Sequence, residues 1–197
     1  MTKALDRAIA ALAAGEVIVL TGDRLRGGDI DFAMAARHAT AEAINFMATH
    51  GKGLICLALT PAQAMRLGIS LINPGSDRQS GRPHGRSIEA RTGVSTGISA
   101  ADRARTVAVA VDPASTGDDL VSPGHVFPLI AAPGGVAERP AALEASIELV
   151  RRAGAGEAAV ICSIMREDGE MARLDDLADL IAQHDLAVAD IGELVAG

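Results

Sequence analysis

The sequence predicts an α+β domain in which one mixed β-sheet is covered by helices. Amphipathic segments with helical spacing alternate with short apolar runs, and this alternation lacks the strict regularity of a parallel α/β fold. A chain of 197 residues fits one domain and buries about 70% of its unfolded surface. We therefore expect a single domain over residues 1–197.

Periodicity and capping residues locate the individual elements. Gly15 is typical of a helix C-cap, and Thr60 followed by Pro61 predicts the capped start of another helix, as does Ser99. The predicted helices cover residues 5–14, 32–48, 61–67, 100–112, 140–153 and 169–183, and the predicted strands cover residues 17–20, 54–59, 87–90, 158–164 and 187–191.

Two polar segments predict mobile loops. Residues 21–31 (TGDRLRGGDID) leave the first strand, and residues 73–86 (NPGSDRQSGRPHGR) contain no large apolar side chain. Loops at strand ends are common places for functional residues. The basic side chains of the second loop either close over an anion or remain solvated; they are Arg78, Arg82, His84 and Arg86.

Composition excludes several classes of partner. The chain has three Phe, no Trp and no Tyr, and its formal charge is -7, so we expect no nucleic-acid binding. No apolar stretch reaches about 18 residues and the N-terminus does not resemble a signal peptide, so we expect a cytoplasmic protein without a membrane segment. Cys56 and Cys162 lie in apolar runs, which is typical of buried thiols in a reducing compartment.

Five motifs occur in a fixed order along nearly the whole chain. They are GLIC at 53–56, TGISAADRA at 96–104, PGHVFPL at 123–129, GG at 134–135 and DGEMAR at 168–173. Together they resemble the 3,4-dihydroxy-2-butanone 4-phosphate synthase family of riboflavin biosynthesis. The resemblance implies the fold of that family, a homodimer with the active site at the subunit interface, and conversion of ribulose 5-phosphate to a four-carbon ketone phosphate and formate with Mg²⁺.

The chain departs from the family motifs in three segments. The family run Asp-Arg-Glu-Asn-Glu-Gly-Asp is matched by residues 23–29, where Leu25 replaces a metal-binding Glu and Arg26 makes the acidic loop basic. Ala142 replaces the metal-binding His, and Ser163 replaces a catalytic Glu. Leu and Ala have no lone pair to offer Mg²⁺. We therefore expect no metal site and no cofactor.

Other family positions are retained. His125 matches an essential His and can act as acid or base near neutral pH, although a lone His is more often structural. Planar guanidinium groups suit phosphate binding, and Asp29 fits either a substrate hydroxyl or a helix cap. The catalytic candidates are His125 and Cys56, and the substrate-binding candidates are Arg24, Asp29, Thr96 and Arg139.

Three functions remain open at this point. The departures favour a metal-independent lyase or isomerase that acts on a small anionic polyol or sugar phosphate. A second hypothesis is a non-catalytic paralogue that binds a ligand or an active dimer partner. The third is an authentic synthase that holds its metal with substitute ligands, for which Asp23, Asp29 and Asp31 are candidates.

Overall fold

The computed structural model describes residues 2–72 and 83–196. The strands are β1 (Ile18–Asp23), β2 (Asp29–Ala35), β3 (Cys56–Leu59), β4 (Ile88–Ala90), β5 (Leu120–Ile130), β6 (Ala159–Ser163) and β7 (Ala187–Asp190). The α-helices are α1 (Lys3–Ala14), α2 (Ala41–Gly51), α3 (Pro61–Arg66), α4 (Ala100–Val111), α5 (Gly135–Glu138), α6 (Ala142–Arg152), α7 (Ala178–His184) and α8 (Ile191–Ala196). Short 3-10 turns are η1 (Arg24–Arg26), η2 (Ala36–His38), η3 (Gly117–Asp119) and η4 (Leu174–Leu177).

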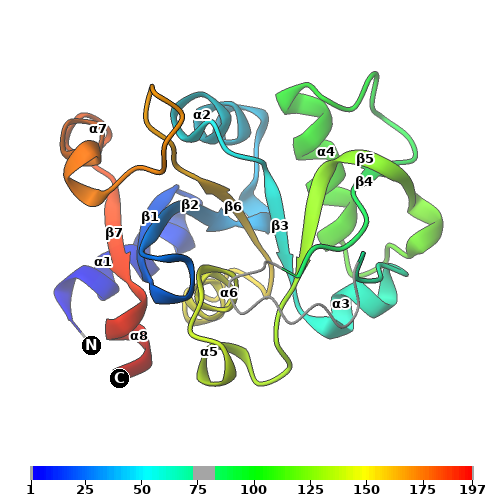
Figure 1. Cartoon of the computed structure of the whole chain (residues 1–197). Coiled ribbons are helices and arrows are strands. Elements are labelled where there is room, and N and C mark those ends of the chain that lie inside the picture. Colours follow the sequence, from blue (N-terminus) through cyan, green and yellow to red (C-terminus); the bar gives the residue numbers. More distant parts are fainter. Residues whose placement is uncertain (1, 73–82, 197) are drawn as a thin grey trace.

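All seven strands form one mixed sheet in the order β4-β5-β3-β6-β2-β1-β7. β3 pairs with β5 and β1 pairs with β7 in parallel, whereas the other neighbouring strands are antiparallel. Helices cover both faces of this sheet (Figure 1). The predicted α+β architecture is therefore confirmed.

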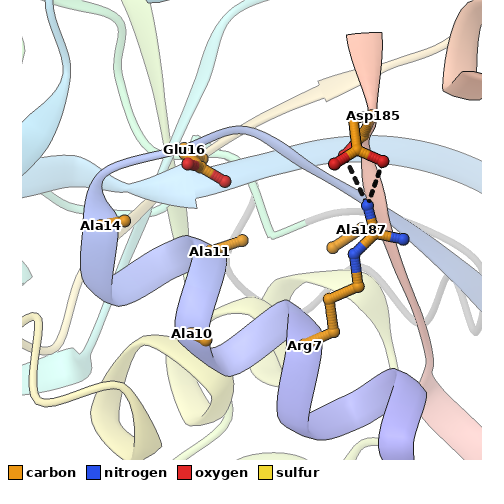
Figure 2. Close-up of a pocket in the computed structure, with 7 residues that line it drawn as sticks. All are labelled: Arg7, Ala10, Ala11, Ala14, Glu16, Asp185 and Ala187. Atoms are coloured by element: carbon orange, nitrogen blue, oxygen red, sulfur yellow. Dashed lines mark hydrogen bonds and ion pairs between the residues drawn. The ribbon is translucent and has the colours of Figure 1, made fainter. Parts of the chain in front are cut away.

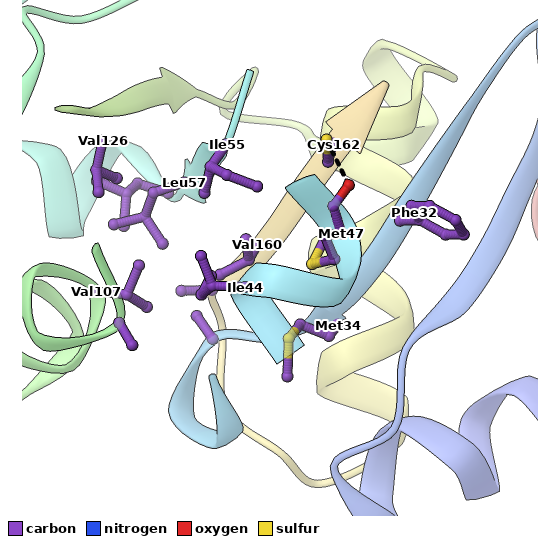
Figure 3. Close-up of a cluster of buried hydrophobic side chains, with 14 of the residues drawn as sticks. Phe32, Met34, Ile44, Met47, Ile55, Leu57, Val107, Val126, Val160 and Cys162 are labelled. Carbon is purple, nitrogen blue, oxygen red and sulfur yellow. Dashed lines mark hydrogen bonds between the residues drawn. The ribbon is translucent and has the colours of Figure 1, made fainter. Parts of the chain in front are cut away.

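Each face of the sheet carries its own apolar core. On one face, α2 and α4 pack Ile44, Met47 and Val107 against strand residues such as Phe32 and Val160 (Figure 3). On the other face, α1, α6 and α8 pack against a second cluster. Because successive strand side chains point to opposite faces, residue parity decides which core each strand residue enters.

Local capping agrees with the sequence signals. Gly15 ends α1 with a left-handed φ of 83°, which a residue with a Cβ rarely adopts. Thr60 begins α3 with a complete capping box, and the Ser99 hydroxyl accepts the amide N–H of Asp102 at the start of α4. Caps of this kind each stabilise by about 1 kcal/mol.

Three predicted segments differ from the structure. Residues 21–31, predicted as a loop, form the end of β1, the turn η1 and the start of β2. Residues 32–35 belong to β2 and not to a helix, because pairing with β1 and β6 overrides the helical preference of Ala and Met. The helix predicted at 169–183 is limited to η4 and α7.

The predicted loop at 73–86 is only partly described. Residues 73–82, including Arg78 and Arg82, lie outside the described residues. His84 and Gly85 form bridges to Leu129 and Leu71. None of the helices among residues 2–72 and 83–196 is long and apolar enough to cross a membrane.

Candidate functional site

Five polar or nucleophilic side chains share one face of the sheet. Ser163 pairs with Asp31 across β6 and β2, and His125 lies two residues before Phe127, the partner of Cys56. Alternation places these side chains on the face that α6 covers, together with Glu89 of β4, which contacts His125. The part of this face that carries the five side chains is therefore the candidate site, and we call it the rim.

A carboxylate cluster occupies one end of this rim. We use this name for Asp23, Asp29 and Asp31, which surround the guanidinium of Arg26. Arg26 Nε lies 2.8 Å from Asp23 Oδ2, one terminal nitrogen lies 3.7 Å from Asp29 Oδ2, and the other pairs with Asp31 Oδ2. The Ser163 hydroxyl donates to Asp31 Oδ1 at 2.9 Å. The hairpin β1–η1–β2 thus gathers three carboxylates around one guanidinium group.

The side chain of Asp23, which is not part of helix α6, also caps the N-terminus of that helix. The N-cap residue Ala141 has no side-chain acceptor, and Asp23 Oδ2 instead accepts the N–H of Ala142 at 2.9 Å. A carboxylate at a helix N-terminus is favoured by the helix dipole and by the unpaired amide groups. Asp23 is 1% exposed, and its Oδ1 atom has no hydrogen-bond partner. An unpaired buried carboxylate oxygen is costly, so it indicates a role beyond capping.

Glu144 is a further buried acid in the first turn of α6. Its Oε1 accepts the N–H of Ala132 at 3.0 Å and lies 3.7 Å from a terminal nitrogen of Arg139, while Oε2 has no partner. Burial raises the pKa of this carboxyl above its usual value, and the nearby charge of Arg139 opposes that shift only in part.

A histidine and a glutamate lie in contact at the other end of the rim. Nδ1 of His125 is 2.6 Å from Oε2 of Glu89, and we call these two residues the histidine pair. Gly97 packs against the Glu89 carboxylate with a φ of 85°, so the TGIS loop borders the pair. Asp102 holds that loop, because its carboxylate accepts the Ser95 hydroxyl and the N–H groups of Ser95 and Gly97.

The structure separates the predicted site residues into these two groups. Asp29 belongs to the carboxylate cluster, Arg139 lies near it, and Arg24 is exposed in η1 beside it. Thr96 is exposed next to Gly97, near the histidine pair. Cys56 lies between the two groups in strand order but is 1% exposed within the core.

The two groups do not meet within one chain. His125 is on β5 and Asp31 is on β2, with β3 and β6 between them. Three strand spacings amount to about 14 Å. Sequence spacing gives no sign of Glu89, because it lies 36 residues from His125 and only the pairing of β4 with β5 brings them together.

Another hollow lies far from both groups. It is lined by α1 and β7, and the ion pair between Arg7 and Asp185 crosses its edge at 2.7 Å (Figure 2). Small alanine side chains line much of the hollow and offer no chemistry to a ligand. It therefore adds nothing to the candidate site.

Comparison with known proteins assigns the family. A protein-family profile described as 3,4-dihydroxy-2-butanone 4-phosphate synthase matches residues 6–197. The chain belongs to the 3,4-dihydroxy-2-butanone 4-phosphate synthase family.

Relatives of this family are similar over almost the whole chain. The chain is 44% identical over 193 residues to riboflavin biosynthesis protein RibBA of Aquifex aeolicus, covering 97% of this chain and 48% of that protein. It is 41% identical over 191 residues to a 3,4-dihydroxy-2-butanone 4-phosphate synthase of Pseudomonas aeruginosa, covering 97% of this chain and 52% of that protein. The chain thus spans about half the length of these relatives.

The fold matches solved structures of the same family. A crystal structure of 3,4-dihydroxy-2-butanone 4-phosphate synthase in complex with two magnesium ions superposes with a TM-score of 0.92 at 32% identity, covering 99% of this chain and 96% of that one. A two-domain synthase from A. baumannii superposes with a TM-score of 0.89 at 39% identity, covering 96% of this chain and 56% of that one.

These similarities correct two predictions. The main functional prediction, a metal-independent lyase or isomerase, is wrong, because relatives more than 40% identical over nearly the whole chain are named as synthases. The prediction of no cofactor is wrong for the same reason and because a solved relative is in complex with magnesium. Both predictions rested on Leu25 and Ala142, and the structure places the carboxylate of Asp23 against the backbone N–H of Ala142.

The carboxylate cluster offers oxygen atoms of the kind that a hard divalent cation prefers. Mg²⁺ prefers oxygen ligands, often takes only one or two carboxylates from the protein, and keeps water and substrate oxygens for the rest. The unpaired Oδ1 of Asp23 supplies one such oxygen. Among the described residues no group of three or more His, Cys, Asp or Glu side chains is arranged to hold a metal as it stands. Arg26, which pairs with Asp23 and Asp31, occupies the middle of the cluster.

Proposed function

We propose that this chain converts ribulose 5-phosphate to 3,4-dihydroxy-2-butanone 4-phosphate and formate. The observation that carries the proposal is the carboxylate cluster, in which a buried Asp23 keeps an unpaired oxygen at the place where the family motif begins. Folding alone gains nothing from such an oxygen, whereas a substrate or cation site does. The similarity to named synthases over nearly the whole chain supports the same reaction.

The finer proposal is that the cluster replaces the metal ligands missing at Leu25 and Ala142. Asp23 and Asp31 would hold Mg²⁺, with Asp29 at the edge of the cluster. When bound, the ion would hold neighbouring oxygens of the sugar and stabilise negative charge on them. Ser163 stands where the family has a Glu, and its hydroxyl keeps Asp31 oriented through their hydrogen bond.

The histidine pair supplies the proton transfers. The Glu89 carboxylate accepts a hydrogen bond from Nδ1–H of His125, and this tautomer leaves Nε2 to exchange a proton with the substrate. Enolisation of a ketose needs a group of this kind within reach of a C–H or O–H bond. Thr96 borders the pair and can donate to a substrate oxygen, and Cys56 lies buried on the neighbouring strand β3.

Arginine side chains around the carboxylate cluster suit the phosphate. Arg24 is exposed in η1, and Arg139 is largely buried beside Glu144. Guanidinium groups bind phosphate oxygens in pairs, which fixes the orientation of the sugar chain. We assign the phosphate to these two residues and a sugar hydroxyl to Asp29.

The two groups of residues require a second subunit. The strands that carry them lie about 14 Å apart in one chain, which is a wide gap for the reacting carbons of a five-carbon sugar phosphate to span. We propose a homodimer in which the carboxylate cluster of one subunit faces the histidine pair of its partner. The partial exposure of His125 at the rim is consistent with such an interface, since its side chain is 42% exposed in the single chain.

Formate release tests the reaction directly. The protein is incubated with ribulose 5-phosphate and Mg²⁺, and formate is measured by a coupled formate dehydrogenase assay. We expect turnover that is abolished by a chelator and by Asp23→Asn, which keeps an acceptor for Ala142 N–H but removes the charge. Absence of formate from a folded protein with Mg²⁺ present would refute the proposed function.

Mixing two inactive variants tests the shared site. His125→Ala leaves the carboxylate cluster intact, and Asp23→Asn leaves the histidine pair intact. After subunit exchange, half of the dimers contain one complete site, so activity returns to about a quarter of the wild-type value. If each chain carried a complete site, the mixture would stay inactive.

A further inference from the structure

Arg26 stands in the position that the proposed function gives to a divalent cation. Its guanidinium contacts Asp23 Oδ2 at 2.8 Å and pairs with Asp31 Oδ2, and its side chain is only 9% exposed. A metal ion and a guanidinium cannot share these oxygens, because they need the same lone pairs and repel each other. Any cation that uses Asp23 and Asp31 must therefore displace Arg26.

The carboxylate cluster is not neutralised by Arg26. Three carboxylates face one guanidinium, and Asp29 receives only one further contact, from Arg173 at 3.3 Å. Asp23 Oδ1 is buried and unpaired, and Asp31 is fully buried. Arg26 therefore leaves at least one buried carboxylate oxygen of the cluster, Asp23 Oδ1, without a partner that a cation could supply.

The turn that carries Arg26 can release it without disturbing the core. Gly27 and Gly28 follow directly with φ values of 70° and 84°, and no heavy atom lies within 4 Å of the position of a Cβ on either. Arg26 itself belongs to the short turn η1 and not to a strand. A change of backbone angles at these two glycines costs little free energy, because glycine adopts positive and negative φ values about equally readily.

A phosphate group gives the released side chain a new partner. Arg24 lies in the same turn, and Arg139 is close to the first turn of α6, so an anion bound here is within reach of several guanidinium groups. Exchanging carboxylates for phosphate leaves Arg26 paired and frees Asp23 and Asp31.

We propose that Arg26 is a displaceable internal cation that couples metal binding to substrate binding. This inference rests on the proposed function and adds the order in which the sugar phosphate and the divalent cation bind. The phosphate of the sugar draws Arg26 away from Asp23 and Asp31, and the divalent cation then takes its place. Because coupling is reciprocal, the metal also tightens binding of the sugar phosphate by the same factor.

Metal titrations of three proteins test the coupling. Binding of Mn²⁺ is followed by the loss of its free electron paramagnetic resonance signal, with and without ribitol 5-phosphate, which has no carbonyl group and cannot react. The proteins are the wild type, Arg26→Met, which keeps length but removes charge, and Arg7→Met as a control. Arg7 forms an exposed ion pair with Asp185 and contacts no residue of the cluster (Figure 2).

The expected pattern is specific to Arg26. Wild type and Arg7→Met bind Mn²⁺ weakly alone and about 5–150-fold more tightly with ribitol 5-phosphate. Arg26→Met binds Mn²⁺ tightly without the sugar phosphate and gains little from it. Equal affinity of wild type and Arg26→Met for Mn²⁺ alone would overturn the inference. If Arg26→Met does not fold, the wild-type titrations alone test the inference. A wild-type affinity for Mn²⁺ that is the same with and without ribitol 5-phosphate would exclude coupling.

The inference and the proposed function fail in different ways. Coupled binding of Mn²⁺ and ribitol 5-phosphate without formate release from ribulose 5-phosphate would refute the reaction and leave the role of Arg26 standing. Formate release with a metal affinity that does not depend on Arg26 would refute the inference and leave the reaction standing.

Discussion

His125 and Glu89 face each other across two antiparallel strands, with Nδ1 of the imidazole 2.6 Å from Oε2 of the carboxylate. Glu89 is the more buried of the two, with 15% of its side chain exposed against 42% for His125. A buried carboxylate behind a more exposed imidazole is the arrangement that orients a general acid or base.

Glu89→Gln should lower kcat and leave KM nearly unchanged. The amide keeps the size of the side chain but no longer stabilises a protonated imidazole. General acid–base catalysis contributes about 10²–10⁴-fold, so we expect a loss of about 10–100-fold from Glu89→Gln and a larger loss from His125→Ala. Formate kinetics over a range of pH, with thermal melts as a folding control, check this. Wild-type kcat in Glu89→Gln would exclude the positioning role.

Asp102→Asn should loosen the loop that carries Thr96. The hydrogen bond from the Ser95 hydroxyl lowers the pKa of Asp102, and backbone N–H groups of Ser95 and Gly97 add to this shift. The lowered pKa stabilises the fold above the ordinary value of 3.8, and this stabilisation is lost as pH falls through the folded pKa.

The matched variants for this loop are Asp102→Asn and Ser95→Ala. We expect Asp102→Asn to reduce kcat/KM by on the order of tenfold, because misplacing a substrate-positioning group costs rate. Ser95→Ala removes one of the three contacts and should have a smaller effect. The difference in melting temperature between Asp102→Asn and wild type should disappear as pH falls below 3.8. A difference that persists in acid would contradict this account.

Glu144→Gln should raise stability at neutral pH. Burial raises the pKa of Glu144 above 4.5, so its contribution to stability is fully present below 4.5 and is lost as pH rises through the folded pKa. The amide keeps the acceptor for Ala132 N–H and carries no charge. Melting temperatures at pH 4 and pH 7.5 check this, since each kcal/mol corresponds to about 2–4 °C. A lower melting temperature for Glu144→Gln at pH 7.5 would show that Arg139 stabilises the ionised form.

Neither cysteine should react with a thiol reagent in the folded protein. Cys56 and Cys162 are both free and buried, and burial raises the pKa of the Cys162 thiol to about 12. The thiolate is the reactive form, so labelling at pH 8 should require unfolding in urea. Rapid labelling of one thiol in the native state would instead identify Cys56 as accessible.

The same pKa shift predicts a loss of stability in alkali. The unfolded thiol ionises near 9.0, so the stabilising effect of the buried neutral thiol is present below pH 9 and is lost as pH rises towards 12. The chain has no Tyr, which removes one competing titration. Cys162→Ala should therefore lose less stability than wild type between pH 9 and 11.

Elements with local signals were predictable from the sequence. Gly15 and Thr60 end and begin helices through contacts with residues a few positions away. Residues 32–35 were not, because their strand pairing depends on β6, more than 120 residues later in the chain.

The site was predictable only in part for the same reason. Motif matching found His125 and Asp29, but the contact between Glu89 and His125 needs the sheet. Leu25 and Ala142 led to the prediction of no metal site, whereas the fold places Asp31 beside Asp23 through a β-hairpin. Single positions say little about a site when neighbouring strands bring other carboxylates to it.

The pairing of β7 with β1 has a consequence for synthesis. β1 is complete after residue 23, but the strand that covers its free edge, from Ala187 to Asp190, is made last. At ribosomal rates the backbone amides and carbonyls of Ile18 to Thr21 wait roughly ten to thirty seconds for these partners. Until then the unpaired N–H and C=O groups along this edge of β1 are open to pairing with a strand of another chain, which favours aggregation.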